Sequence, residues 1–443
     1  MDRASGDGRL ATDAESDGLV SVSRELADVS FGAVLAMEGT SRIGWTTPDG
    51  LEIVGRGAAS RFAATGPDRF AAIRSTAEEC FGALDHEGPA ESRPRAFGGF
   101  AFHDGHVPQP PWSGFGAATF VVPRVQLTRT DDGTWLTVVE GDAEAAAASL
   151  DRWADRLERL PAMRPIGSPP GVASVRPTAS REEWTAGVRT ALDRIDRGEL
   201  EKVVLARAVS VEPNSPVDVP AVLERLRRRY PSCYRFLLDF GAGGTFFGAP
   251  PERLVSRRGR TVETEALAGS VPRGESPETD DEHATRLLES GRLTREHGLV
   301  VEAIRDQLAP LATTVDVAER TVRRLATIQH LRTPIEARLD GDRHVLELVE
   351  ALHPTPAVGG LPPATAWETI RRVEPFDRGW YAAPVGWFDA DGDGEFAVAI
   401  RAGVVTDGAV TLYAGNGIVA DSDPDEEWEE VQLKLRPILD ELE

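Results

Sequence analysis

The sequence predicts an α+β protein built on antiparallel sheets. Segments in which apolar and polar residues alternate occur through the first 165 residues, between turns rich in glycine and proline. Later strand segments come as hairpin-like pairs, such as 396–405 followed by 410–414, and helices and strands occur in blocks. Blocks of like elements favour this class over a doubly wound sheet.

The first part of the chain is expected to be rich in strands. Residues 1–18, rich in Asp, Ser and Gly, predict a flexible start. A break dense in Pro and Gly at 163–171 predicts a boundary near residue 170. It would divide an N-terminal β-rich subdomain, 19–170, from a catalytic domain, 171–443. The elements expected before the boundary are strands at 41–46, 51–55, 119–127 and 135–140, and a helix at 142–160.

The second part opens on a helix signature. Ser180 can cap a helix, and Glu183 follows at the spacing of a capping box. An apolar stripe then runs along Trp184, Val188, Leu192 and Ile195. The other elements expected here are helices at 280–308 and 368–372, and strands at 202–211, 234–240, 244–247, 396–405 and 410–414.

The net charge is −23, with 72 acidic residues. Such a surface disfavours nucleic acid and anionic membranes, because phosphate contacts need basic patches. It resembles the acidic proteins of salt-loving archaea, so a halophilic protein is expected. With no apolar leader and no run approaching ~18 apolar residues, the sequence predicts a soluble, cytoplasmic protein. Cys80 and Cys233 lack metal or redox spacing and are expected to be buried thiols.

Two lysines, Lys202 and Lys434, stand among 49 basic residues that are otherwise all arginine. Arginine keeps its proton at any workable pH. A desolvated lysine can lose its proton and act as a base. Lys202 follows an amphipathic helix and begins an apolar strand, which makes it the stronger candidate.

Nine segments, in this order, resemble the chorismate-utilising enzymes, the superfamily of anthranilate, aminodeoxychorismate, salicylate and isochorismate synthases. The resemblance extends from about residue 178 to the C-terminus; upstream, only 97–102 is similar. It implies two large antiparallel sheets that face each other, with helices outside and the active site between them. The segments are 248–254, 265–270, 296–297, 328–333, 353–358, 378–381, 399–402, 413–419 and 427–434.

Three positions indicate which branch the chain resembles. Amidating members typically carry Gln where this chain has Lys202, and water, a poorer nucleophile than ammonia, needs a base. Aminodeoxychorismate synthases carry Lys at the position of Ala268. Salicylate synthases usually have Thr at the position of Ala357. The resemblance therefore implies an isochorismate synthase, with a salicylate synthase and a non-catalytic chorismate-binding component as the alternatives.

The resemblance also implies roles for individual residues. Lys202 would be the base that activates water, and Glu252 the acid that protonates the departing hydroxyl. Glu296 and Glu430 match metal carboxylates, with Glu427 as a further ligand or neighbour, and the cofactor would be Mg²⁺. The remaining substrate-binding positions are Arg401, Tyr381, Lys434, Gly415, Gly417, His330, Ala357, Gly269 and Ser270.

The expected partner is the small molecule chorismate, a dianion. No glutaminase constellation of Cys, His and Glu is visible, so no obligatory amidotransferase subunit is expected. Isochorismate feeds either menaquinone or siderophore synthesis, and the composition favours menaquinone.

Overall fold

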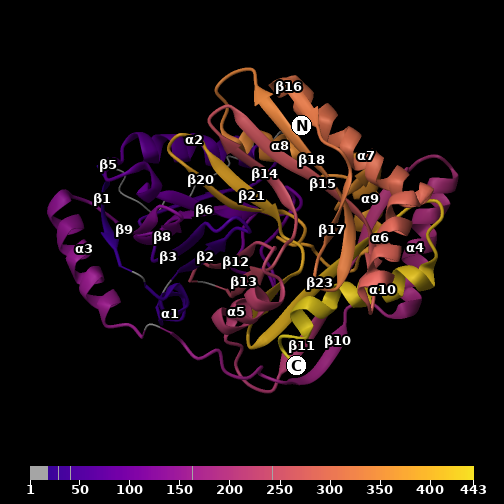
Figure 1. The fold of residues 1–443 in the computed structure, drawn as a ribbon, viewed down its shortest axis with the longest axis horizontal. Helices are drawn as coiled ribbons and strands as arrows, with labels where there is room; N and C mark the ends of the chain where they lie inside the picture. Colours follow the sequence, from indigo (N-terminus) through magenta and orange to yellow (C-terminus); the bar gives the residue numbers. More distant parts are fainter. Residues whose placement is uncertain (1–17, 28, 40, 162, 242) are drawn as a thin grey trace, which may run out of the picture.

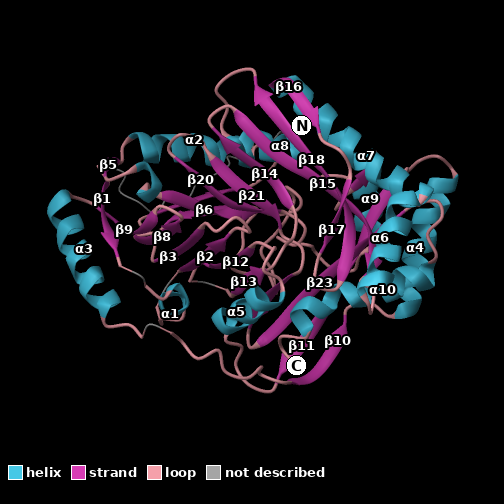
Figure 2. Cartoon of the chain, in the orientation of Figure 1, coloured by secondary structure: helices cyan, strands magenta, loops and turns pink. Residues whose placement is uncertain are grey.

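The computed structural model describes residues 18–443, except residues 28, 40, 162 and 242. Residues 1–17 of the predicted flexible start therefore lie outside the described residues. Within the described part, a 13-stranded and a 10-stranded sheet form the molecule, with helices packed on their outer faces (Figures 1 and 2). The predicted α+β class with large antiparallel sheets is confirmed. Among the described helices, none has the length and apolar character needed to cross a lipid bilayer.

In the larger sheet the strand order is β10-β11-β23-β22-β13-β12-β2-β3-β8-β9-β1-β5, and β19 pairs with β11. Every described pairing in it is antiparallel except that of β1 with β5. The strands are β1 (Val20–Leu26), β2 (Arg42–Thr46), β3 (Glu52–Arg56), β5 (Asp85–Glu87), β8 (Val125–Thr130), β9 (Gly133–Glu140), β10 (Val172–Pro177), β11 (Lys202–Pro213), β12 (Arg235–Asp239), β13 (Thr245–Gly248), β19 (Gly360–Leu361), β22 (Ala402–Thr406) and β23 (Ala409–Ile418).

In the smaller sheet the strand order is β16-β18-β15-β14-β21-β20-β6-β7-β4, and β17 pairs with β18. The strands are β4 (Ser60–Ala64), β6 (Arg95–Phe100), β7 (Ala118–Val122), β14 (Arg253–Arg258), β15 (Thr261–Pro272), β16 (Ala312–Val317), β17 (Thr321–Arg324), β18 (Ile328–Leu339), β20 (Pro384–Asp389) and β21 (Gly394–Val398).

Helices cover both sheets. α4 and α10 pack on β11 and β23, α7 packs on β15, and α3 packs on β1 and β9. α2 lies against β4, and α8 against β14. The helices are α1 (Phe31–Leu35), α2 (Arg69–Gly82), α3 (Ala143–Glu158), α4 (Arg181–Asp196), α5 (Val219–Arg229), α6 (Pro277–Glu289), α7 (Gly291–Leu308), α8 (Val345–Leu352), α9 (Pro363–Val373) and α10 (Pro424–Leu439), with 3₁₀ turns at Ala90–Ser92 and Ala309–Leu311.

Three expected elements are each divided in two. The helix at 280–308 is two helices, because Ser290 ends α6 with an extended backbone and caps α7 by accepting from the Leu293 N–H. The strand at 119–127 is interrupted at Pro123, which has no N–H to donate. The strand at 396–405 breaks before Arg401, whose φ of 49° is incompatible with a pleated strand.

The helix cap predicted from the sequence is confirmed. Ser180 caps α4 through a capping box with Glu183. The helix expected at 142–160 is α3, and both cysteines are buried free thiols.

Both sheets contain strands from either side of residue 170. In the larger sheet β2 pairs with β12, and in the smaller sheet β6 pairs with β20. A single apolar core also runs through both parts of the chain. The division into residues 19–170 and 171–443 stays a prediction about chain organisation, and it does not separate two cores.

Candidate active site

One cavity of about 130 Å³ lies between the two sheets. Strands β11 and β23 of the larger sheet and strands β15 and β18 of the smaller one contribute to it, together with α7 and α10. Every residue predicted from the sequence to form the site lines this cavity, namely Lys202, Glu252, Gly269, Ser270, Glu296, His330, Ala357, Tyr381, Arg401, Gly415, Gly417, Glu427, Glu430 and Lys434.

Lys202 is the first residue of β11 and is 1% exposed. Its Nζ lies 2.8 Å from Oε1 of Glu296 on α7. Gly417, on the neighbouring strand β23, makes room for this ion pair. A Cβ on that glycine would lie 2.8 Å from Lys202 Cε and 2.9 Å from Glu296 Oε1. The ion pair thus holds the amine in a fixed place against the cavity.

Glu252 lies in the segment between β13 and β14 and is 4% exposed. Burial, and then the nearby charge of Glu265, raise the pKa of its carboxyl to about 8, against the opposing charges of Lys202 and Arg323. A carboxyl with this pKa carries its proton at neutral pH. It is therefore able to serve as a general acid there.

Three carboxylates, those of Glu296, Glu427 and Glu430, line the cavity. Glu430 lies 2.8 Å from Lys434 on the same face of α10. Among the described residues, no three His, Cys, Asp or Glu side chains converge as a ready metal site. Mg²⁺ keeps several waters and needs only one or two carboxylates besides substrate oxygens. The donor set fits a cation that binds together with an anionic substrate, and it does not form a closed cage.

A buried cation faces the cavity at Arg401. The side chain is 8% exposed and ion-pairs with no carboxylate of the described chain. Burial lowers the pKa of its guanidinium. A buried charge without a partner is costly, so this position indicates that an anionic ligand supplies the missing charge. Arg401 has a left-handed backbone conformation and lies in the break between β21 and β22, where its side chain lines the cavity.

His330 on β18 lies beside Arg401. Its Nε2 accepts from an Arg401 Nη2 at 3.5 Å, which leaves Nδ1–H to donate to the Gly269 carbonyl at 3.3 Å. Ser270 Oγ lies 3.1 Å from the same Nδ1. Burial and the Arg401 charge hold the pKa of this imidazole well below its usual range. His330 is thus a neutral hydrogen-bonding group.

Two tyrosine rings form one wall. Tyr381 stacks on Tyr413 with ring centroids 5.1 Å apart and an interplanar angle of 18°. Gly415 approaches this wall closely, because a Cβ there would lie 3.3 Å from the Tyr381 hydroxyl. The amine of Lys434, which also lines the cavity, donates to the Gly415 carbonyl at 3.3 Å.

The sequence analysis did not single out Arg378 and Tyr413, although both occur in segments that carry the resemblance. Arg378 is buried and ion-paired with Glu374, and it donates to the carbonyls of Val204 and Val358. It thereby ties β11 to the loop that carries Ala357. The two carbonyls lie 20 and 174 residues away in the chain, so a single motif gives no sign of them.

A family model, curated relatives and solved structures all indicate one family, the chorismate-binding enzymes. The family model "Chorismate binding enzyme" matches residues 8–443. The isochorismate synthase MenF of Bacillus subtilis is 38% identical over 355 residues, which are 79% of this chain and 74% of the relative. The salicylate biosynthesis isochorismate synthase of Pseudomonas aeruginosa is 36% identical over 404 residues, covering 90% and 84% of the two chains.

Solved structures agree. The menaquinone-specific isochorismate synthase MenF of Escherichia coli superposes with a TM-score of 0.82 at 29% identity, over 96% of this chain and 95% of that one. Anthranilate synthase component I of Streptococcus pneumoniae has a TM-score of 0.72 at 23% identity, over 91% and 92% of the chains. The second likeness bears on the fold alone.

Proposed function

We propose, from the premise that this chain belongs to the chorismate-binding enzyme family, that it is an isochorismate synthase. Such an enzyme is an isomerase that interconverts chorismate and isochorismate. One observation carries the proposal: a buried lysine and a buried glutamic acid line the same cavity as an arginine that ion-pairs with no carboxylate among the described residues. Isochorismate synthases of two organisms align with most of the chain.

The reaction adds a hydroxyl at ring C2 and removes the hydroxyl at C4, while the ring double bonds shift. Lys202 takes a proton from the attacking water, whose oxygen bonds to C2. Glu252 gives its proton to the C4 hydroxyl, which leaves as water. The lysine thus gains a proton and the glutamate loses one, and the reverse reaction restores both.

The substrate's two carboxylates would be held by Arg401, by Lys434 and by backbone N–H groups around Gly415 and Gly417. Tyr381 and His330 border the same space. Since His330 is neutral, it contributes a hydrogen bond without adding charge. The positive side chains orient the dianion with its ring between base and acid.

Mg²⁺ is the proposed cofactor, with Glu296 and Glu430 as ligands and Glu427 as a third ligand or a neighbour of the site. Bound there, the cation would neutralise a substrate carboxylate and so fix the orientation of the ring. Glu296 also pairs with Lys202, so this carboxylate would contact both the base and the cation.

Ala357 supports isochorismate as the accumulating product. It lines the cavity where salicylate-forming relatives usually carry a threonine. An alanine leaves the enolpyruvyl group without a polar neighbour, so pyruvate elimination should be slow compared with release. We further propose that the product serves menaquinone synthesis, and that the enzyme acts in the cytoplasm without an amidotransferase subunit. The likeness to the menaquinone-specific enzyme supports the pathway.

The test is incubation of the purified protein with chorismate and Mg²⁺ at high salt, followed by chromatography. Isochorismate should form without pyruvate, and the same mixture should be reached from isochorismate. Ammonium salts should give no aminated product. Stoichiometric salicylate and pyruvate would instead establish a salicylate synthase, and no conversion by a folded protein would indicate a non-catalytic chorismate-binding component.

A further inference from the structure

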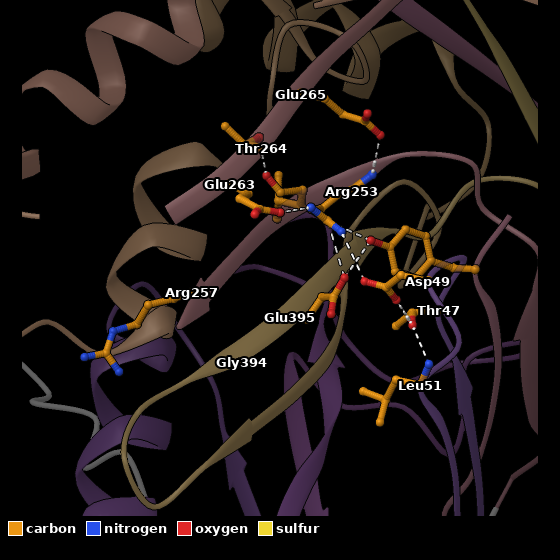
Figure 3. Close-up of polar contacts among 12 residues, drawn as sticks. Thr47, Asp49, Leu51, Arg253, Arg257, Glu263, Thr264, Glu265, Gly394 and Glu395 are labelled. Carbon is orange, nitrogen blue, oxygen red and sulfur yellow. Dashed lines mark hydrogen bonds and ion pairs between the residues drawn. The ribbon is translucent and has the colours of Figure 1, made fainter. Parts of the chain in front are cut away.

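Glu265 lies beside the proposed acid but does not line the cavity. It is a residue of β15, and its side chain is 6% exposed. Its Oε1 accepts from the backbone N–H of Arg253 at 3.3 Å, as Figure 3 shows. Arg253 directly follows Glu252, whose own carbonyl accepts from Val398 N–H at 3.1 Å. The peptide group that joins Glu252 to Arg253 is therefore fixed by hydrogen bonds at both its C=O and its N–H.

Two arginines neutralise Glu265. Arg323 of β17 donates to Oε1 at 2.9 Å, and Arg332 of β18 donates to Oε2. Arg323 also donates to the Ser232 carbonyl, so its guanidinium is held in place. A buried carboxylate and two arginines thus form a charged cluster that contacts the residue following the acid.

The charges that act on Glu252 come from three different strands. Glu265 of β15 disfavours its ionised form, while Lys202 of β11 and Arg323 of β17 favour it. Within its own segment the neighbouring cation is Arg253, whose guanidinium turns away to Tyr234, Glu263 and Glu395. Across the cavity lie Arg401, Lys434 and Glu296.

We infer that Glu265 is a positioning residue for Glu252, holding its backbone through the Arg253 N–H and opposing, by its charge, the ionisation that Arg323 promotes. The inference rests on the proposed function only in taking Glu252 as the acid. The pKa of about 8 at Glu252 agrees with this arrangement, since burial and Glu265 are its two leading causes.

The test titrates Glu252 in the whole protein by infrared spectroscopy. The protonated carboxyl band that vanishes in Glu252→Gln reports on this residue. In Glu265→Gln the amide oxygen still accepts from Arg253, but the negative charge is lost. The titration of Glu252 should therefore move to lower pH. Arg323→Gln removes a positive charge, so the titration should move to higher pH.

Glu263→Gln is the matched control, because Glu263 lies two residues earlier on β15 and contacts the exposed end of Arg253. In this variant Glu252 should titrate at the same pH as in the parent. The inflection near pH 8 in kcat should move with the infrared titration in each variant, while KM for chorismate stays unchanged.

The inference would be overturned if Glu252 titrated at the same pH in the parent and in both variants, Glu265→Gln and Arg323→Gln. It would also be overturned if both variants moved the titration in the same direction. If Glu265→Gln fails to fold, the upward shift in Arg323→Gln still decides. The infrared measurement needs no substrate. A parent that makes no isochorismate would therefore refute the proposed function without deciding this inference.

Discussion

At the residue scale, burial sets the chemistry of the cavity. Lys202 and Glu252 are both almost inaccessible to solvent, and Lys202 pairs with Glu296 at 2.8 Å. The buried glutamate keeps a proton at neutral pH, and the buried lysine is held by Glu296. The two groups can exchange roles in the reverse reaction because the same cavity holds both.

Replacing Lys202 by Gln should lower kcat for isochorismate formation by about 10² to 10⁴, the typical contribution of a general base. The amide cannot accept the proton from water, while its size keeps the strand packed. Some ammonia-dependent amination should appear instead. An unchanged thermal melt would show that the fold is intact, and near-normal hydroxylation would remove Lys202 as the base.

Replacing Glu252 by Gln should stabilise the fold at pH 8 while abolishing turnover. The carboxyl has a pKa of 4.5 when unfolded and about 8 when folded. Its contribution to stability is therefore full below pH 4.5 and is lost as the pH rises to about 8. The variant's gain over the parent should be near zero at low pH and on the order of a few kcal/mol at pH 8. Thermal melts of both proteins across this range measure the difference, and a gain independent of pH would contradict it.

Glu296→Gln and Glu430→Gln should each raise the Mg²⁺ concentration needed for half-maximal activity. Each substitution removes one anionic ligand from a site that offers few. A magnesium titration of activity makes the comparison. Curves identical to that of the parent in both variants would exclude these residues as ligands.

At the scale of elements, close approach of strands β11 and β23 fixes the base. Gly417→Ala should lower kcat by about 100-fold, because the new Cβ would displace Lys202 and Glu296, and a misplacement of about 1 Å can cost that much. Gly298→Ala, on the helix that carries Glu296, has open space around its Cβ and should leave kcat unchanged. Equal activity of both variants would show that the approach is not required.

Local signals in the sequence predicted the site better than the elements around it. Capping at Ser180 depends on neighbours in sequence, and the positions that line the cavity lie in short segments that carry the family resemblance, so both were predictable. The break at Arg401 depends on a left-handed residue within an apolar run, which hydrophobic periodicity does not mark. Glu265 pairs with Arg323 of another strand, and Arg378 donates to Val204 from a loop 174 residues away, so no pattern within one segment specifies these contacts.

At the scale of the whole molecule, the net charge of −23 opposes both folding and the binding of a dianion. Raising salt shortens the Debye length from ~30 Å at 0.01 M to ~3 Å at 1 M. Stability and turnover should therefore rise with salt toward molar concentrations, until screening weakens the contacts of Arg401 and Lys434. Thermal melts and kinetics over a salt series test this, and full activity in ~0.05 M salt would exclude a salt adaptation.

The strand order also governs how the chain folds as it is made. Strand β6 is paired on one side by β7, soon after synthesis, but its other neighbour is β20, with Phe97 opposite Trp387. At about 5–20 residues per second, roughly 290 residues separate the two partners in synthesis, which corresponds to tens of seconds. Throughout that interval an apolar strand edge from the middle of the finished sheet stays open on the ribosome. The edge of β6 therefore stays open to wrong pairing until β20, near the end of the chain, has emerged.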